Sequence, residues 1–231
     1  MTPDEDLYLR SLFAHNSPEA CASFFKAANQ EKQLRGVEGG YHTLYLGCLL
    51  KTLTKPSEPL NYCLPAFVKD PNEVPEVKSE KNESEEDELM IKLKKVNECI
   101  GSDVNTTTKY LEELDRVVSK KPSEVLTTLN RNSSLGNDLQ LEKNDTEEVI
   151  KRKVGVAVES NCLDTLSEIE AAKSLDTQAF AMFKANLCLF SSMCKREFRQ
   201  CLATQDSHRG FAKCLENKDQ MECFKTYKEK L

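Results

Sequence analysis

Apolar residues recur every three or four positions along most of the chain, which is the period of an amphipathic helix. In the N-terminal part this pattern predicts helices over residues 6–15, 19–28 and 41–53. Ser17 is suited to cap the second of these, and Pro18 is suited to its first position. Glycine and proline residues after each apolar stretch end the pattern, so these helices are expected to be separate elements.

The middle of the chain predicts helices over residues 89–100 and 106–121, and a short one over 123–129. Residues 131–145 are polar and rich in turn formers, which favours a loop. The valines at 154, 156 and 158 alternate as in a strand, but their helical surroundings favour a helix.

The clearest pattern begins at Asp176, which is expected to cap a long helix of about six turns. Its apolar stripe consists of Phe180, Phe183, Leu187, Phe190, Cys194, Phe198 and Cys201. A turn-forming stretch then reverses the chain, and shorter apolar faces follow. The fold class expected is all-α, with a helical module over 1–69, an acidic disordered linker over 70–88, a helical segment over 89–130, a polar loop over 131–146 and a helical C-terminal module over 147–231.

Composition supports this class, because 39% apolar and 30% charged residues with only 8 Gly and 8 Pro suit amphipathic helices. The net charge of -6 is concentrated between residues 71 and 88, and the rest of the chain is neutral overall. A nucleic-acid partner is not expected, because a basic face is missing. No apolar run is long enough to span a membrane, and the first twenty residues do not resemble a signal peptide. We therefore expect an intracellular chain or one whose leader has been removed.

The ten cysteines are the residues with the most specific chemistry: Cys21, Cys48, Cys63, Cys99, Cys162, Cys188, Cys194, Cys201, Cys214 and Cys223. Cys194 and Cys201 are two helical turns apart and share a face. An antiparallel helical hairpin would bring Cys201 near Cys214 and Cys194 near Cys223. Cys214 and Cys223 are nine residues apart, which is about two and a half turns of a helix. In one straight helix they would lie on opposite faces, so both could not face the first arm. We therefore expect residues 216–220 to bend or interrupt the second arm.

The stretch CKREFRQCLATQDSHRGFAKCLENKDQMEC resembles the twin-cysteine hairpins of the coiled-coil-helix-coiled-coil-helix family of the mitochondrial intermembrane space. Members usually carry two Cx9C pairs, whereas this chain has Cx6C and Cx8C, over about 30 of its 231 residues. The resemblance implies import without a cleaved presequence and oxidation of the cysteines in that compartment. The last three cysteines, with gaps of twelve and eight residues, are also similar to the end of insect odorant-binding proteins.

Other interpretations of the cysteines stay open. Cysteines in an apolar helical stripe are often reduced core residues. Metal or redox chemistry is less favoured, because CxxC and CxxxxC pairs are missing. His208 follows Cys201 by seven residues and could activate a thiolate, but a solvated loop histidine is the favoured interpretation. Neither catalytic residues nor a cofactor or metal site are predicted.

Three functions are compatible with these observations. The first is a non-enzymatic helical accessory or assembly protein of the mitochondrial intermembrane space with a protein partner. The second is a secreted helical carrier or host-interaction protein, supported by four sequons at Asn82, Asn105, Asn132 and Asn144 and by a phenylalanine stripe that could enclose a lipophilic ligand. The third is a reduced cytoplasmic scaffold.

Overall fold

The computed structural model of the protein describes residues 1–16, 21–36, 39–55, 61, 64–65, 83–102, 104–135 and 137–230. These residues form helices and their connections, with no strand among them, which confirms the all-α prediction. The chain folds into two compact units. One unit consists of residues 1–16 and 114–231, and the other of residues 17–113.

This division differs from the segments expected from the sequence. The expected modules followed chain order, but the first helix belongs with the C-terminal helices and not with its neighbours over 17–69. The expected middle segment, 89–130, is shared between the two units. Apolar periodicity shows which face of a helix is buried, but not which other helix covers it, and this accounts for the difference.

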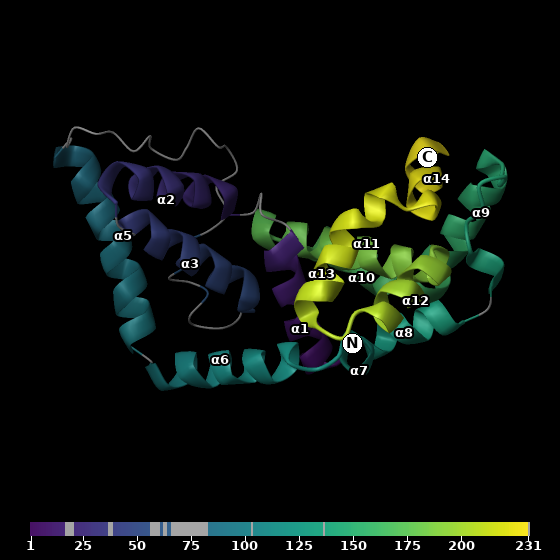
Figure 1. Ribbon diagram of the computed structural model, residues 1–231, viewed down its shortest axis with the longest axis horizontal. Helices are drawn as coiled ribbons and strands as arrows, with labels where there is room; N and C mark the ends of the chain where they lie inside the picture. Colours follow the sequence, from purple (N-terminus) through teal and green to yellow (C-terminus); the bar gives the residue numbers. More distant parts are fainter. Residues whose placement is uncertain are drawn as a thin grey trace. The chain divides into compact units, whose positions relative to one another are not determined.

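The 17–113 unit is built from α2 (Ala22–Arg35), α3 (Gly40–Leu53) and α5 (Glu83–Ser102), and it also contains most of α6 (Val104–Val118). α3 packs against both α2 and α5, as Figure 1 shows in its purple to blue part. The core of this unit consists of Ala27, Ala28, Tyr41, Leu44, Leu64 and Val96. A disulfide joins Cys21, at the start of α2, to Cys48 of α3.

A buried glutamate organises the start of α3. The residue before the helix, Gly39, has no side chain that could accept from the first free amides. Glu31 of α2 supplies this acceptor, because its Oε2 accepts a hydrogen bond from the Tyr41 N–H at 3.0 Å. Glu31 is 1% exposed, and a Cβ at Gly39 would overlap its carboxyl group. Glycine at 39 therefore makes room for the carboxylate that caps α3.

The disordered linker expected over residues 70–88 is only partly covered by the described residues, and the covered part needs correction. α5 begins at Glu83, so residues 83–88 are helical rather than part of a disordered linker. Acidic residues suit this position because the amino end of a helix carries a partial positive charge. Residues 70–82, like the expected cap and first position at Ser17 and Pro18, lie outside the described residues.

The other unit contains α1 (Pro3–Asn16) and the helices that follow α6. In chain order these are α7 (Pro122–Val125), α8 (Thr127–Ser134), the 3-10 turn η3 (Asn137–Leu139), α9 (Glu147–Ala157), the π-helical turn η4 (Val158–Cys162), α10 (Leu163–Ala171), α11 (Leu175–Met193), α12 (Lys195–Thr204), α13 (His208–Glu216), the 3-10 turn η5 (Asn217–Gln220) and α14 (Glu222–Lys230). The valines at 154, 156 and 158 lie in α9 and η4, as predicted for a helix.

α1 packs against α11 and α13 through its apolar side chains. Phe13 lies between Phe180 and Phe183 of α11, with ring centroids 5.6 and 5.4 Å away. The phenylalanine stripe expected from the sequence is therefore covered by protein side chains. Tyr8 and Leu12 of the same helix are fully buried.

A second buried glutamate ties α1 to α8. Leu126 precedes α8 and has no polar side chain to cap it. Glu5 of α1 is fully buried and accepts hydrogen bonds from the Thr128 N–H at 3.0 Å and the Thr128 hydroxyl at 2.7 Å. The carboxylate thus replaces a local cap, across 123 residues of sequence. α1 is consequently a structural part of this unit.

The long helix expected from Asp176 is two helices. Ser174 caps α11 with a capping box to Thr177, so Asp176 lies in the first turn and is not the cap. α11 ends at Met193, and Cys194 takes a non-helical conformation (φ -116°, ψ 51°) before α12 begins. The periodic stripe continues across this break, which is why periodicity alone predicts one helix.

The expected polar loop over 131–146 also needs correction. Residues 131–134 belong to α8, where Asn132 and Ser133 are buried. Gln140 and Leu141 are buried as well, and the Leu141 N–H donates to the Met193 carbonyl oxygen at 2.8 Å. Part of this polar stretch is therefore packed and hydrogen-bonded inside the unit, whereas Asp138, Glu142, Lys143 and Asn144 are exposed.

No helix among the described ranges is both long and apolar enough to cross a membrane.

Replacing Glu5 with alanine is expected to lower the free energy of unfolding by about 2 kcal/mol, because two amides and a hydroxyl at the start of α8 lose a charged acceptor. Urea unfolding measured by circular dichroism would show the change. Glu112→Ala, at an exposed position of α6, is the matched control and should shift stability by less than about 0.5 kcal/mol. Equal midpoints for the two variants would contradict the capping role of Glu5.

Candidate functional site at the C-terminal disulfide hairpin

The C-terminal hairpin, residues 194–230, contains two disulfides that join its arms. Cys194 is bonded to Cys223, and Cys201 is bonded to Cys214. The Cα atoms are 5.7 Å apart in the first bridge and 5.9 Å apart in the second. These are the two pairs expected from folding the sequence as an antiparallel hairpin.

The structure also contains the interruption expected in the second arm. α13 ends at Glu216, η5 follows, and Met221 is extended (φ -72°, ψ 137°) before α14 begins. This break allows Cys214 and Cys223 to lie on the same side although they are nine residues apart. The helical phase is therefore reset between the two bridges.

A cluster of four phenylalanine rings joins the arms of the hairpin to each other and to the end of α11. The ring of Phe198 in α12 packs edge-on against Phe190 at 5.7 Å and against Phe211 of α13 at 6.0 Å, measured between centroids. Phe190 in turn contacts Phe224 of α14 at 5.8 Å. Aromatic contacts thus link α12 and α14 to the end of α11 and link α13 to α12, alongside the two disulfides.

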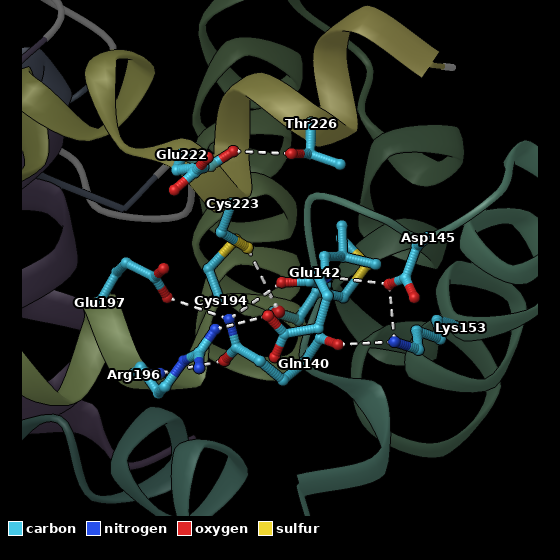
Figure 2. Close-up of a disulfide and its surroundings, with 12 residues drawn as sticks. Gln140, Glu142, Asp145, Lys153, Cys194, Arg196, Glu197, Glu222, Cys223 and Thr226 are labelled. Carbon is cyan, nitrogen blue, oxygen red and sulfur yellow. Dashed lines mark hydrogen bonds and ion pairs between the residues drawn. A yellow bond between two sulfur atoms is a disulfide. The ribbon is translucent and has the colours of Figure 1, made fainter.

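Polar residues surround the outer Cys194–Cys223 bridge, as Figure 2 shows. The Cys223 sulfur lies 3.3 Å from the Met193 carbonyl oxygen. Gln140 accepts from the Arg196 N–H at 3.1 Å and donates to Glu197 at 3.1 Å, so it caps the start of α12. Lys153 donates to the Gln140 carbonyl oxygen at 2.7 Å and holds this segment in place.

The local sequence does not predict this polar shell. Gln140 is separated from Arg196 by 56 residues, and no local spacing connects them. The one available signal is that Leu139 and Leu141 flank Gln140 inside an otherwise polar stretch. Leu139 is half-buried and Leu141 is buried, as expected for a segment that packs against other helices of the unit.

Disulfides also occur outside the hairpin. Cys162 in the π-helical turn η4 is bonded to Cys188 of α11, and Cys21 is bonded to Cys48 in the other unit. All eight cysteines whose side chains the structure describes are therefore paired. Cys63 and the side chain of Cys99 lie outside the described residues. Within the described ranges, no group of three or more His, Cys, Asp and Glu side chains is arranged to hold a metal ion.

His208 is not the solvated loop residue expected from the sequence. It is the first residue of α13, and its ring lies edge-on to that of Tyr8 with the centroids 4.9 Å apart. Its Nε2 and the Tyr8 hydroxyl are buried, and neither has a hydrogen-bond partner. Burial, and to a smaller degree the nearby His15, lowers the pKa of His208 from 6.5 to about 4. The imidazole is therefore neutral at neutral pH and packs as part of the α1–α13 contact.

The sequons occupy unequal environments. Asn132 is buried in α8, with its side-chain amide 3.7 Å from the Cys188 sulfur, so a glycan at this position is incompatible with the fold. Asn144 is exposed in the turn before α9. Asn82 and the side chain of Asn105 lie outside the described residues. The expectation that the sequons are accessible is therefore wrong for Asn132.

Comparisons with protein family models, with curated proteins and with solved structures find no match to this chain.

Replacing both Cys201 and Cys214 with alanine is expected to lower the free energy of unfolding by about 2 to 4 kcal/mol, because the unfolded chain loses a closed loop. Thermal unfolding without reductant would measure the change. An unchanged melting temperature would show that this bridge does not form in the protein.

Stability should fall as the pH decreases from 6.5 to 4, in part because of His208. Its pKa is about 4 in the folded protein and near 6.5 in the unfolded chain, so the unfolded chain binds the extra proton in this window. The stabilisation is complete above pH 6.5, and about 2 kcal/mol of it is lost by pH 4. His208→Phe keeps a buried ring and removes the proton site. Urea unfolding across this range should show a shallower pH dependence for the variant, and parallel curves would contradict the assignment.

Proposed function

We propose that the protein is a non-enzymatic helical accessory or assembly protein that folds in an oxidising compartment, the mitochondrial intermembrane space, and binds a protein partner through its C-terminal hairpin. The observation that carries this proposal is the pairing of all eight described cysteines across both units. Disulfides of this number persist in oxidising compartments and are rare where thiols are kept reduced. The pairing therefore counts against a reduced cytoplasmic scaffold.

The hairpin supports the choice of compartment. Two bridges that join two helical arms are the arrangement implied by the resemblance to twin-cysteine hairpin proteins. The break at η5 accommodates the unusual Cx8C spacing, so the departure from Cx9C is compatible with two bridges. The burial of Asn132 removes part of the support for the secreted alternative.

The outer surface of α12 gives the chemistry of the expected partner. Arg196, Arg199, Gln200 and Ala203 are exposed and follow one another at helical spacing, and we call them the α12 outer stripe. Arg196 is paired with Glu142 at 2.9 Å, whereas Arg199 extends the positive charge along the helix. An acidic surface on the partner would complement this stripe and steer the encounter.

The secreted alternative keeps one specific observation in its favour, the exposed sequon at Asn144. A protein that passes through the secretory pathway would present this asparagine for glycosylation, whereas an intermembrane-space protein would not meet the enzymes that add the sugar. The glycan state of Asn144 therefore separates the two candidate compartments.

Three measurements on protein from its native source test the proposal. Thiol trapping should find Cys194, Cys201, Cys214 and Cys223 oxidised, and mass spectrometry should find no sugar at Asn144. Cell fractionation should recover the protein with mitochondria. Alkylatable thiols at these four positions would contradict the oxidised hairpin. A sugar on Asn144 would contradict the mitochondrial compartment and favour secretion.

Charge reversal tests the partner surface separately. If the native protein migrates in a complex larger than its 26.2 kDa chain, Arg199→Glu should weaken that complex about ten-fold or more, because it places a negative charge opposite the acidic partner. Arg152→Glu, at an exposed position of α9, is the control and should leave the complex intact. Native electrophoresis of both variants measures the outcome, and equal complex formation would contradict the role of the α12 outer stripe.

A further inference from the structure

The two sulfurs of the Cys201–Cys214 bridge differ in their surroundings. Among the eight described cysteines, seven are buried with at most 3% of their surface exposed, and Cys214 alone is partly exposed. It lies at the edge of the buried face of α13, which is formed by Phe211, Ala212 and Leu215. Cys201, its partner, has no exposed surface. The bridge therefore joins a partly exposed cysteine to a fully buried one.

This difference determines how a thiolate can open the bridge. Exchange requires the attacking sulfur to reach one sulfur of the disulfide while the other leaves. Attack on the other described bridges would require the units to open first, because both of their sulfurs are buried. We propose that Cys201–Cys214 is a reversible thiol–disulfide exchange site, and that Cys214 is the sulfur attacked.

Charged side chains of both signs are exposed on α13 around Cys214. Lys213 precedes it, Arg209 lies five residues before it, and Glu216 lies two residues after it. The positive side chains can attract an incoming thiolate, whereas Glu216 opposes them. The partner implied is a thiol reductant, such as a dithiol oxidoreductase with an accessible thiolate.

The exchange balances with a dithiol as the reductant. The first thiolate forms a bond with the Cys214 sulfur, and the Cys201 sulfur leaves as a thiolate that takes up a proton. The second thiol of the reductant then attacks the mixed disulfide and becomes part of its own disulfide. Cys214 is released as a thiol, so the dithiol loses two electrons and the bridge gains them.

The fold is suited to survive this opening. A reduced Cys201 is a small apolar residue that can stay in the core. The edge-on contact of Phe198 with Phe211 continues to hold α12 against α13, and the Cys194–Cys223 bridge is not involved. Opening is therefore expected to loosen the α12–α13 connection without unfolding the unit.

The site is tested on the purified, fully oxidised chain without denaturant. Glutathione is added, the mixture is quenched with acid, and peptide mapping locates the mixed disulfide. We expect the first adduct on Cys214. A first adduct on Cys201, or on a cysteine of another described bridge, would overturn the proposal. The result does not depend on the compartment or partner proposed above, so the two can fail separately.

Two single variants test the difference in exposure directly. Cys201→Ser leaves Cys214 as a free thiol, and Cys214→Ser leaves Cys201. Native Cys201→Ser should react with a chromogenic disulfide reagent at least about ten-fold faster than native Cys214→Ser, because reaction follows access to the thiolate. Circular dichroism establishes that both are folded. Equal rates in folded variants would contradict the proposal, and the glutathione mapping on the unmodified chain decides it if either variant does not fold.

Discussion

Among the described helices that begin without a local side-chain cap, three receive the missing acceptor from a buried side chain elsewhere in the chain. Glu31 accepts from the start of α3, Glu5 from the start of α8 and Gln140 from the start of α12. Unpaired amides at a buried helix end would each cost roughly 1 to 3 kcal/mol. The capping side chains therefore fix which helices lie together, because each cap exists only when two particular elements meet.

The start of α12 shows why such a cap is needed. Cys194 occupies the position where serine or aspartate would usually accept from the helix amides, but its sulfur is bonded to Cys223. Its side chain cannot serve both purposes. Gln140 takes over the capping, and Lys153 and Glu197 hold it in the required orientation. The disulfide and the polar residues around it thus depend on each other. Because Cys194 is in the bridge, its side chain does not cap α12, and Gln140 supplies the acceptor instead.

The features that the sequence predicts correctly are those that depend on local spacing. The helical class follows from apolar periodicity, and the interruption between Cys214 and Cys223 follows from the rotation of a helix over nine residues. The features it does not predict depend on distant residues. Nothing near His208 shows that Tyr8 will cover it, and the stripe through Cys194 shows no break, because a bend can preserve the buried face. The polar stretch 131–146 does not show by itself that Asn132 and Gln140 are buried, because their partners on α11 and α12 are distant in the sequence.

Buried polar groups and disulfides are complementary in this fold. The interior of the unit that contains α1 includes charged Glu5, Lys184 and Lys195, whose removal from water costs free energy even when they are paired. Such a core specifies one arrangement but adds less stability than an apolar core of the same size. Cross-links act on the unfolded chain instead, because they remove conformations that it could otherwise adopt. Bridges therefore stabilise the fold without replacing the polar contacts that define it, and a partly exposed bridge at Cys214 can open while those contacts still hold the helices together.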